Sequence, residues 1–96
     1  MKMLLVTYNE ALDDEVMEVL HVSGVAGYTK WTRVLGDGRS SGPHLATPVW
    51  PKANNVLMAA VEDAQVPPLI ECLKALRADL SKEGVKAFVM PLEAVT

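Results

Sequence analysis

The sequence has a single cysteine, few aromatic residues and no cluster of basic residues. Because Cys72 has no second cysteine to pair with, the chain forms no internal disulfide, as is typical of proteins in a reducing cytoplasm. Nine Lys and Arg against twelve Asp and Glu give a net charge of −3, and no two basic residues are adjacent. Nucleic acids and anionic membranes bind concentrated positive charge, so we expect neither as a partner.

Long apolar runs are also absent. The longest, residues 56–61, is far shorter than the roughly 18 residues that a membrane-spanning helix needs. The N-terminus lacks the charged-then-apolar pattern of a secretion signal, so we expect no membrane insertion. Half of the 96 residues are nevertheless apolar, which is enough for one compact core. The sequence therefore predicts one cytoplasmic domain covering residues 1–96.

Apolar periodicity predicts four strands and two helices. The predicted strands cover residues 3–8, 27–35, 56–61 and 86–92. The predicted helices cover residues 10–22 and the stretch that begins at Pro67 or Pro68 and is ended by Gly84. This β-α-β-β-α-β order is that of the ferredoxin-like α+β sandwich, in which two helices cover one face of a four-stranded antiparallel sheet. Residues 36–55 have no periodicity and are predicted to be a long exposed loop.

The predicted strand at residues 56–61 is apolar on both of its faces. A strand with one face in solvent should instead alternate apolar and polar residues. Since no further segment of the chain remains to cover the second face, we expect another subunit to cover it. The alternative is that Ala59 and Ala60 are small enough to be tolerated at a surface.

A glycine-rich run follows the second predicted strand, from Gly36 through Asp37 and Gly38 to Arg39. Closely spaced glycines allow successive backbone N–H groups to point at one anion, and an arginine adds a guanidinium group beside them. The run is a candidate site for a phosphate or carboxylate group. The same composition is also typical of an ordinary flexible turn.

The region from Gly24 to His44 resembles the PII nitrogen-regulatory signalling proteins. The residues that match the family's motif are Gly24, Gly27, Thr29, Val34, Gly36, Gly38, Arg39, Gly42 and His44. Lys52 and the stretch from Val56 to Asp63, with its acidic end, also resemble the family's return strand. The resemblance implies a ferredoxin-like homotrimer that binds a small effector in clefts between subunits and regulates a protein target.

The resemblance also assigns candidate ligand-binding residues. Thr29 matches a threonine of the family's nucleotide site, and Lys86 matches a phosphate-contacting lysine before the last strand. The family's nucleotide-contacting loop corresponds to the glycine-rich run, so the full candidate set is Thr29, Gly36, Asp37, Gly38, Arg39 and Lys86. The implied effector is a small molecule such as an adenine nucleotide, with no obligatory cofactor.

The chain departs from the family's pattern in four ways. Ser40 stands where the family has glutamine, and residues 40–52 contain no tyrosine for covalent modification. The family's glycine-rich loop before the last strand is reduced to Glu83-Gly84-Val85, and its basic C-terminal extension has no counterpart before Thr96. Arg39 and Lys86 alone would then face the phosphates, so we expect a monophosphate or diphosphate to bind better than ATP, which carries about four negative charges.

The loop at residues 36–52 is the predicted partner-binding segment. Its candidate contact residues are Ser40, Ser41, His44 and Trp50, and the protein target is unknown. Trp50 is either an anchor for the partner or a packing residue that ties the loop to the sheet.

Two other function classes remain open. A trimeric divalent-metal protein of the CutA type could use His44 as a ligand, although His21, His44 and Cys72 lack a metal-ligand spacing within the chain. A structural subunit that binds no ligand is the other alternative.

An enzyme is not expected. The acidic residues Asp13, Asp14 and Glu15 are consecutive, so they diverge around the predicted first helix, and charge at a helix start explains them. The sequence also has no recognisable arrangement of nucleophile, base and acid.

Overall fold

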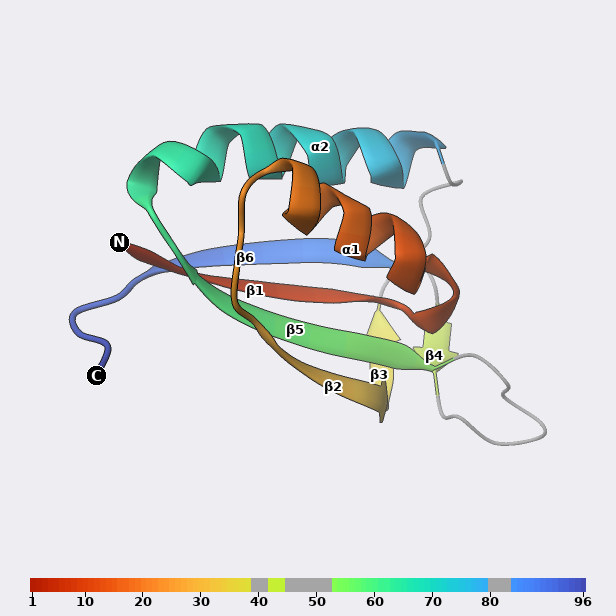
Figure 1. The fold of residues 1–96 in the computed structure, drawn as a ribbon. Coiled ribbons are helices and arrows are strands. Elements are labelled where there is room, and N and C mark those ends of the chain that lie inside the picture. Colours follow the sequence, from red (N-terminus) through yellow and green to blue (C-terminus); the bar gives the residue numbers. More distant parts are fainter. Residues whose placement is uncertain (39–41, 45–52, 80–83) are drawn as a thin grey trace.

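The computed structural model describes residues 1–38, 42–44, 53–79 and 84–96, with the backbone alone at 37, 38, 42–44 and 79. The elements in chain order are β1 (Lys2–Asn9), η1 (Glu10–Leu12), α1 (Asp13–Val22), β2 (Thr29–Val34), β3 (Gly36–Gly38), β4 (Gly42–His44), β5 (Asn54–Val61), η2 (Asp63–Gln65), α2 (Val66–Asp79) and β6 (Val85–Pro91). Strands β2, β5, β1 and β6 form one antiparallel sheet in that order, with both helices on one face (Figure 1). The predicted ferredoxin-like fold is confirmed.

Strand β1 lies at the centre of the sheet and fixes the register of its neighbours. Leu5 is opposite Met58 of β5 on one side and opposite Phe88 of β6 on the other. Because opposite residues in an antiparallel pair point to the same face, each row across the sheet belongs to one face. Strands β2 and β6 are the two edges.

The hydrophobic core lies between this sheet and the helices. Leu4, Val6 and Tyr8 of β1 alternate with residues of the other face and are at most 1% exposed. They pack with Leu57 of β5 and with the buried faces of α1 and α2, where Leu69 is fully buried. The alternation of buried and partly exposed residues along β1 and β5 is what a sheet covered on one face requires.

Local sequence signals start and connect the helices. The Asn9 side chain accepts a hydrogen bond from the Ala11 N–H at 2.9 Å and so begins η1, which leads into α1. Glu62 and Gln65 form a capping box at η2, before α2. Gln65 also donates from Nε2 to the carbonyl of Gly24 at 3.0 Å, which ties the start of α2 to the end of α1.

The structure corrects several predicted boundaries. The helix expected at residues 10–22 begins as a 3-10 turn, and the strand expected at residues 27–35 covers only Thr29–Val34. The loop expected at residues 36–55 holds the β3–β4 hairpin, and its last two residues already belong to β5. Asparagine is poorly represented in strands, which is why the sequence pattern places Asn54 and Asn55 in a loop.

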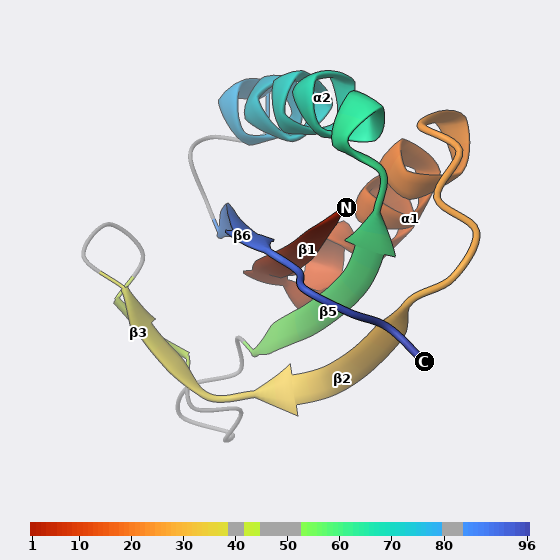
Figure 2. The ribbon, with the colours of Figure 1, turned by 90° about the vertical axis from the view of Figure 1, so that its left-hand side faces the viewer.

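The face of the sheet opposite the helices is left open and apolar. In Figure 2 both helices lie on one side of the sheet, and the hairpin extends away from the end of β2. Trp31 is 47% exposed, Phe88 43% and Met90 40%, and all three belong to rows of the open face. Within the described ranges, no helix has the length and apolar character needed to cross a membrane.

Candidate functional site

The candidate ligand-binding residues with described side chains lie at the two edges of the sheet. Thr29 begins edge strand β2, and Lys86 lies near the start of the opposite edge strand, β6. Both side chains are exposed and lie in rows of the open face, with Thr29 in the row of Met58 and Lys86 in the row of Thr7.

Two strands separate these residues within one chain. Lys86 shares its row with Thr7, Val56 and Trp31. At about 4.8 Å between strands, the backbones of Lys86 and Trp31 are about 14 Å apart. A single subunit therefore does not bring the lysine beside Thr29, although a second copy could place its β6 edge against the β2 edge of the first.

The glycine-rich run forms a short hairpin instead of a continuous loop. Gly36 is opposite His44, Asp37 opposite Pro43, and Gly38 opposite Gly42. Gly36 does not have the positive φ that would make glycine necessary there. A Cβ at this position would instead lie 2.7 Å from Nδ2 of Asn54, so a larger residue here would force the Asn54 side chain to shift.

Several candidates of the partner-binding loop cannot be placed. Arg39, Ser40, Ser41 and Trp50 lie outside the described residues. His44 lies in β4, and its side chain is also outside the described part of the structure.

The end of β2 has an irregular backbone. Trp31 is opposite Val56 and Val34 is opposite Asn54, so Thr32 and Arg33 together face the single residue Asn55. This extra residue is a β-bulge. Arg33 has a φ of 56°, the left-handed conformation that residues with a Cβ rarely adopt.

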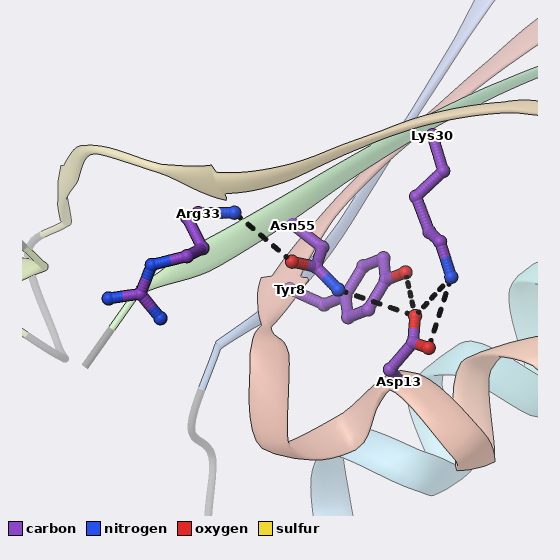
Figure 3. Close-up of polar contacts among 5 residues, drawn as sticks. All are labelled: Tyr8, Asp13, Lys30, Arg33 and Asn55. Carbon is purple, nitrogen blue, oxygen red and sulfur yellow. Dashed lines mark hydrogen bonds and ion pairs between the residues drawn. The ribbon is translucent and has the colours of Figure 1, made fainter. Parts of the chain in front are cut away.

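A polar cluster lies behind this bulge, on the face covered by the helices (Figure 3). Asn55, only 4% exposed, accepts a hydrogen bond at Oδ1 from the Arg33 N–H at 3.4 Å and donates from Nδ2 to Asp13 at 3.3 Å. The Asp13 carboxylate also accepts from the Tyr8 hydroxyl at 2.6 Å and from Nζ of Lys30 at 3.0 Å. We call Tyr8, Asp13, Lys30 and Asn55 the bulge cluster.

The cluster changes the acidity of two of its groups. Partial burial alone raises the pKa of Asp13, but hydrogen bonds from Tyr8 and Lys30 and the charge of Lys30 outweigh it, so the pKa lies below its usual value. Burial and the hydrogen bond to Asp13 raise the pKa of the Tyr8 hydroxyl. At neutral pH the cluster therefore contains an ionised carboxylate and a neutral phenol.

The Arg33 side chain points away from the cluster. Its Nη1 lies 3.2 Å from Oε2 of Glu10 in η1, and the Arg33 side chain is 57% exposed. An ion pair this exposed contributes little stability, so the backbone hydrogen bond to Asn55 is the more important restraint on Arg33.

No metal site is evident in the part of the chain that the structure describes. No group of three or more His, Cys, Asp or Glu side chains is placed there to hold a metal ion. His21 is exposed on α1 and Cys72 is partly buried on α2, in separate helices. The metal hypothesis for His44 stays a prediction.

A comparison with known protein families decides the wider identity. A family model described as "Nitrogen regulatory protein P-II" matches residues 1–96. The chain belongs to this P-II family. The resemblance inferred from the residues between Gly24 and His44 is therefore confirmed, and the chain is a P-II-like regulatory protein. No curated protein sequence matches the chain.

Solved structures of other P-II-like proteins share the fold. The P-II-like protein CPII from Thiomonas intermedia K12, bound to ADP and bicarbonate, is 25% identical with a TM-score of 0.77, over 92% of this chain and 81% of CPII. The structure of CPII bound to ADP, AMP and bicarbonate is 24% identical with a TM-score of 0.78, again over 92% of this chain and 81% of CPII. A P-II-like signalling protein from Thermus thermophilus is 20% identical with a TM-score of 0.59, over 92% of this chain and 82% of the Thermus chain.

The sequence pattern did not reveal the bulge cluster. It attributes Asp13 to the charge of a helix start and Asn55 to a loop, whereas the structure joins both to Tyr8 and Lys30. The available signal was weak: an asparagine pair directly before an apolar strand, and a tyrosine and a lysine within predicted strands.

Proposed function

We propose that this P-II protein is a homotrimeric sensor that binds an adenine nucleotide between the β2 edge of one subunit and the β6 edge of the next. The 36–52 loop then changes its pose and engages or releases a protein target. The observation that carries the proposal is the position of Thr29 and Lys86 in a P-II chain: they lie on one face of the sheet but on opposite edges. A ligand that contacts both needs a second subunit.

The open face of the sheet supports the assembly. Met3, Leu5, Val56 and Met58 are only partly buried there, and Phe88 and Met90 are each at least 40% exposed. Contiguous exposed apolar residues of this kind are typical of an interface between proteins. Association of three such faces would remove them from water.

The expected charge of the site favours a nucleotide with few phosphates. Arg39 and Lys86 supply two cations per cleft, which suits AMP or ADP better than ATP. CPII has been solved with ADP, AMP and bicarbonate bound. We propose the same ligand classes for this chain, with bicarbonate as a second small anion.

The assembly is tested by light scattering of the purified protein at micromolar concentration. We expect three times the mass of the 10.4 kDa chain. A monomer mass would contradict both the trimer and the intersubunit site.

Nucleotide binding is tested by calorimetry with AMP, ADP and ATP, each with and without bicarbonate. We expect AMP or ADP to bind more tightly than ATP, and Lys86→Gln to weaken binding about tenfold through the loss of one charge-assisted hydrogen bond. Lys74→Gln is the matched control, because Lys74 is exposed on α2, which covers the opposite face of the sheet from Lys86. No heat with any nucleotide would leave the ligand-free structural subunit as the remaining hypothesis.

Regulation of a partner is tested by comparing proteins captured by the trimer with and without ADP. Ligand-dependent capture that is lost on Trp50→Ala supports an anchor role for Trp50. Capture that does not respond to the ligand contradicts a signalling loop. Absence of catalysis and a cytoplasmic location remain predictions.

A further inference from the structure

We infer that Asn55 and Asp13 are positioning residues for the 36–52 loop: they hold the bulge in β2, and the bulge sets the direction in which the chain leaves the sheet. The inference rests on the proposed function only for the role of the 36–52 loop in engaging a protein target. The positioning itself is a property of the described residues and can be tested without a ligand.

The bulge requires a restraint because Arg33 adopts an unfavourable backbone conformation. A φ of 56° brings the Cβ of an L-residue close to its own carbonyl group, which is why glycine usually takes such positions. Here the residue is arginine, and its N–H points to Oδ1 of the buried Asn55. Loss of this acceptor would remove the hydrogen bond from a residue that is already in an unfavourable conformation.

Asp13 determines which way the Asn55 amide points. Nδ2 donates to the Asp13 carboxylate, so the opposite end of the same amide, Oδ1, faces Arg33 (Figure 3). The Tyr8 hydroxyl and Lys30 Nζ hold the carboxylate in place from two other strands. The cluster therefore connects β1, α1 and β5 to the last residues of β2.

The bulge determines the face of every residue that follows it. With the bulge, Val34 is opposite Asn54 in a row of the open face. Without it, Arg33 would take that place, and Val34 and Leu35 would each move to the other face. Gly36, which packs against the Asn54 side chain, would lose that contact, and the β3–β4 hairpin would start in another direction.

The inference is tested by solution NMR of the intact protein. The three-bond H–N–Cα–H coupling of Arg33 reports its φ angle. The hydrogen-exchange rates of the backbone amides of residues 34–36 report how firmly the end of β2 is held. In Asn55→Leu we expect the coupling to change to a strand value and the amides to exchange at least about tenfold faster. Arg33→Gly should keep the bulge, because glycine accepts a positive φ without help. The double variant should recover the slow exchange for the same reason.

Two controls separate positioning from a general loss of stability. Leu73→Ala removes core packing on α2, far from the bulge, and should leave the Arg33 coupling unchanged. If Asn55→Leu fails to fold, Asp13→Ala gives the same test at a partly exposed position. An unchanged Arg33 coupling in the folded Asn55 or Asp13 variant overturns the inference, as does a double variant that exchanges as fast as Asn55→Leu.

Ligand binding then gives a second, independent result. If the wild type binds ADP, Asn55→Leu should weaken it about tenfold and Arg33→Gly should restore it in the double variant. If the wild type binds no nucleotide, the proposed function fails while the NMR result still decides the role of Asn55 and Asp13.

Discussion

The two faces of the sheet are built from the same strands but differ in burial: the helices cover one face and leave the other exposed. On the covered face, Val6, Tyr8 and Leu57 are fully buried against the helices. On the open face, their immediate neighbours in sequence, such as Met58, remain partly exposed. Both faces are rich in apolar residues, yet among the described residues helices cover only one of them.

This difference in burial implies that the covered face determines the stability of the single chain, whereas the open face would determine the stability of the proposed trimer. Burial on the covered face stabilises the single chain, because the helices that provide it belong to the same chain. The apolar residues of the open face gain nothing from this, and in the proposed trimer another subunit would cover them. Substitutions of adjacent residues in one strand should therefore affect different properties.

The largest expected effect comes from a charge on the open face. Phe88→Asp should convert the trimer to monomers, because an aspartate cannot be buried unpaired between apolar faces. Light scattering gives the mass, and circular dichroism checks that the fold is retained. A trimer that persists would show that this face is not the interface.

A cavity on the covered face should act on the fold itself. Leu57→Ala should lower the free energy of unfolding by about 3 kcal/mol, as is usual for truncation of a fully buried leucine. Met58→Ala, the next residue on the other face, is the control and should weaken assembly more than folding. Urea denaturation at equal protein concentration compares the two, and equal losses would contradict the distinction between the faces.

The candidate ligand-binding residues should respond in binding rather than in folding. Arg39→Ala should weaken binding of AMP or ADP by roughly 1.5–3 kcal/mol, the range for a hydrogen bond to a charged group. Calorimetry measures the affinity and thermal unfolding measures the stability. Tighter binding of ATP than of ADP in the wild type would show that the cation count is the wrong argument.

The smallest expected effect concerns the polar cluster on the covered face. Tyr8→Phe should cost about 1–2 kcal/mol at pH 8, because it removes a hydrogen bond to the Asp13 carboxylate. The raised pKa of Tyr8 means that wild-type stability is full below the usual tyrosine pKa of about 10 and is lost as the pH rises above it. The difference between wild type and Tyr8→Phe should therefore shrink by about 1.4 kcal/mol at pH 11.

The carboxylate of the cluster has the opposite dependence. The pKa of Asp13 is lowered, so its contribution is present above the usual aspartate pKa of about 3.9 and is lost as the pH falls through the lower folded value. Asp13→Asn should remove this acid sensitivity. Unfolding measured between pH 2 and 6 checks it, and an unchanged acid transition would contradict the role of Asp13.

The sequence alone was sufficient for the order of elements and for the family. The spacing of apolar residues predicts four strands and two helices because each period corresponds to one buried face. The glycines between Gly24 and His44, together with Thr29 and Arg39, are enough to indicate the P-II resemblance from the residues themselves. The apolar character of residues 56–61 also predicts a second covered face, and this stays a prediction.

Only the tertiary structure decided how the chain leaves the sheet and what surrounds Asp13. The bulge at Arg33 and the burial of Asn55 depend on contacts between residues 5 to 42 positions apart in sequence, and no local preference favours arginine at positive φ or asparagine in a strand. The structure likewise placed Thr29 and Lys86 on opposite edges of one face. Local periodicity reports which side of an element is buried, whereas the pairing of distant strands determines which side chains meet.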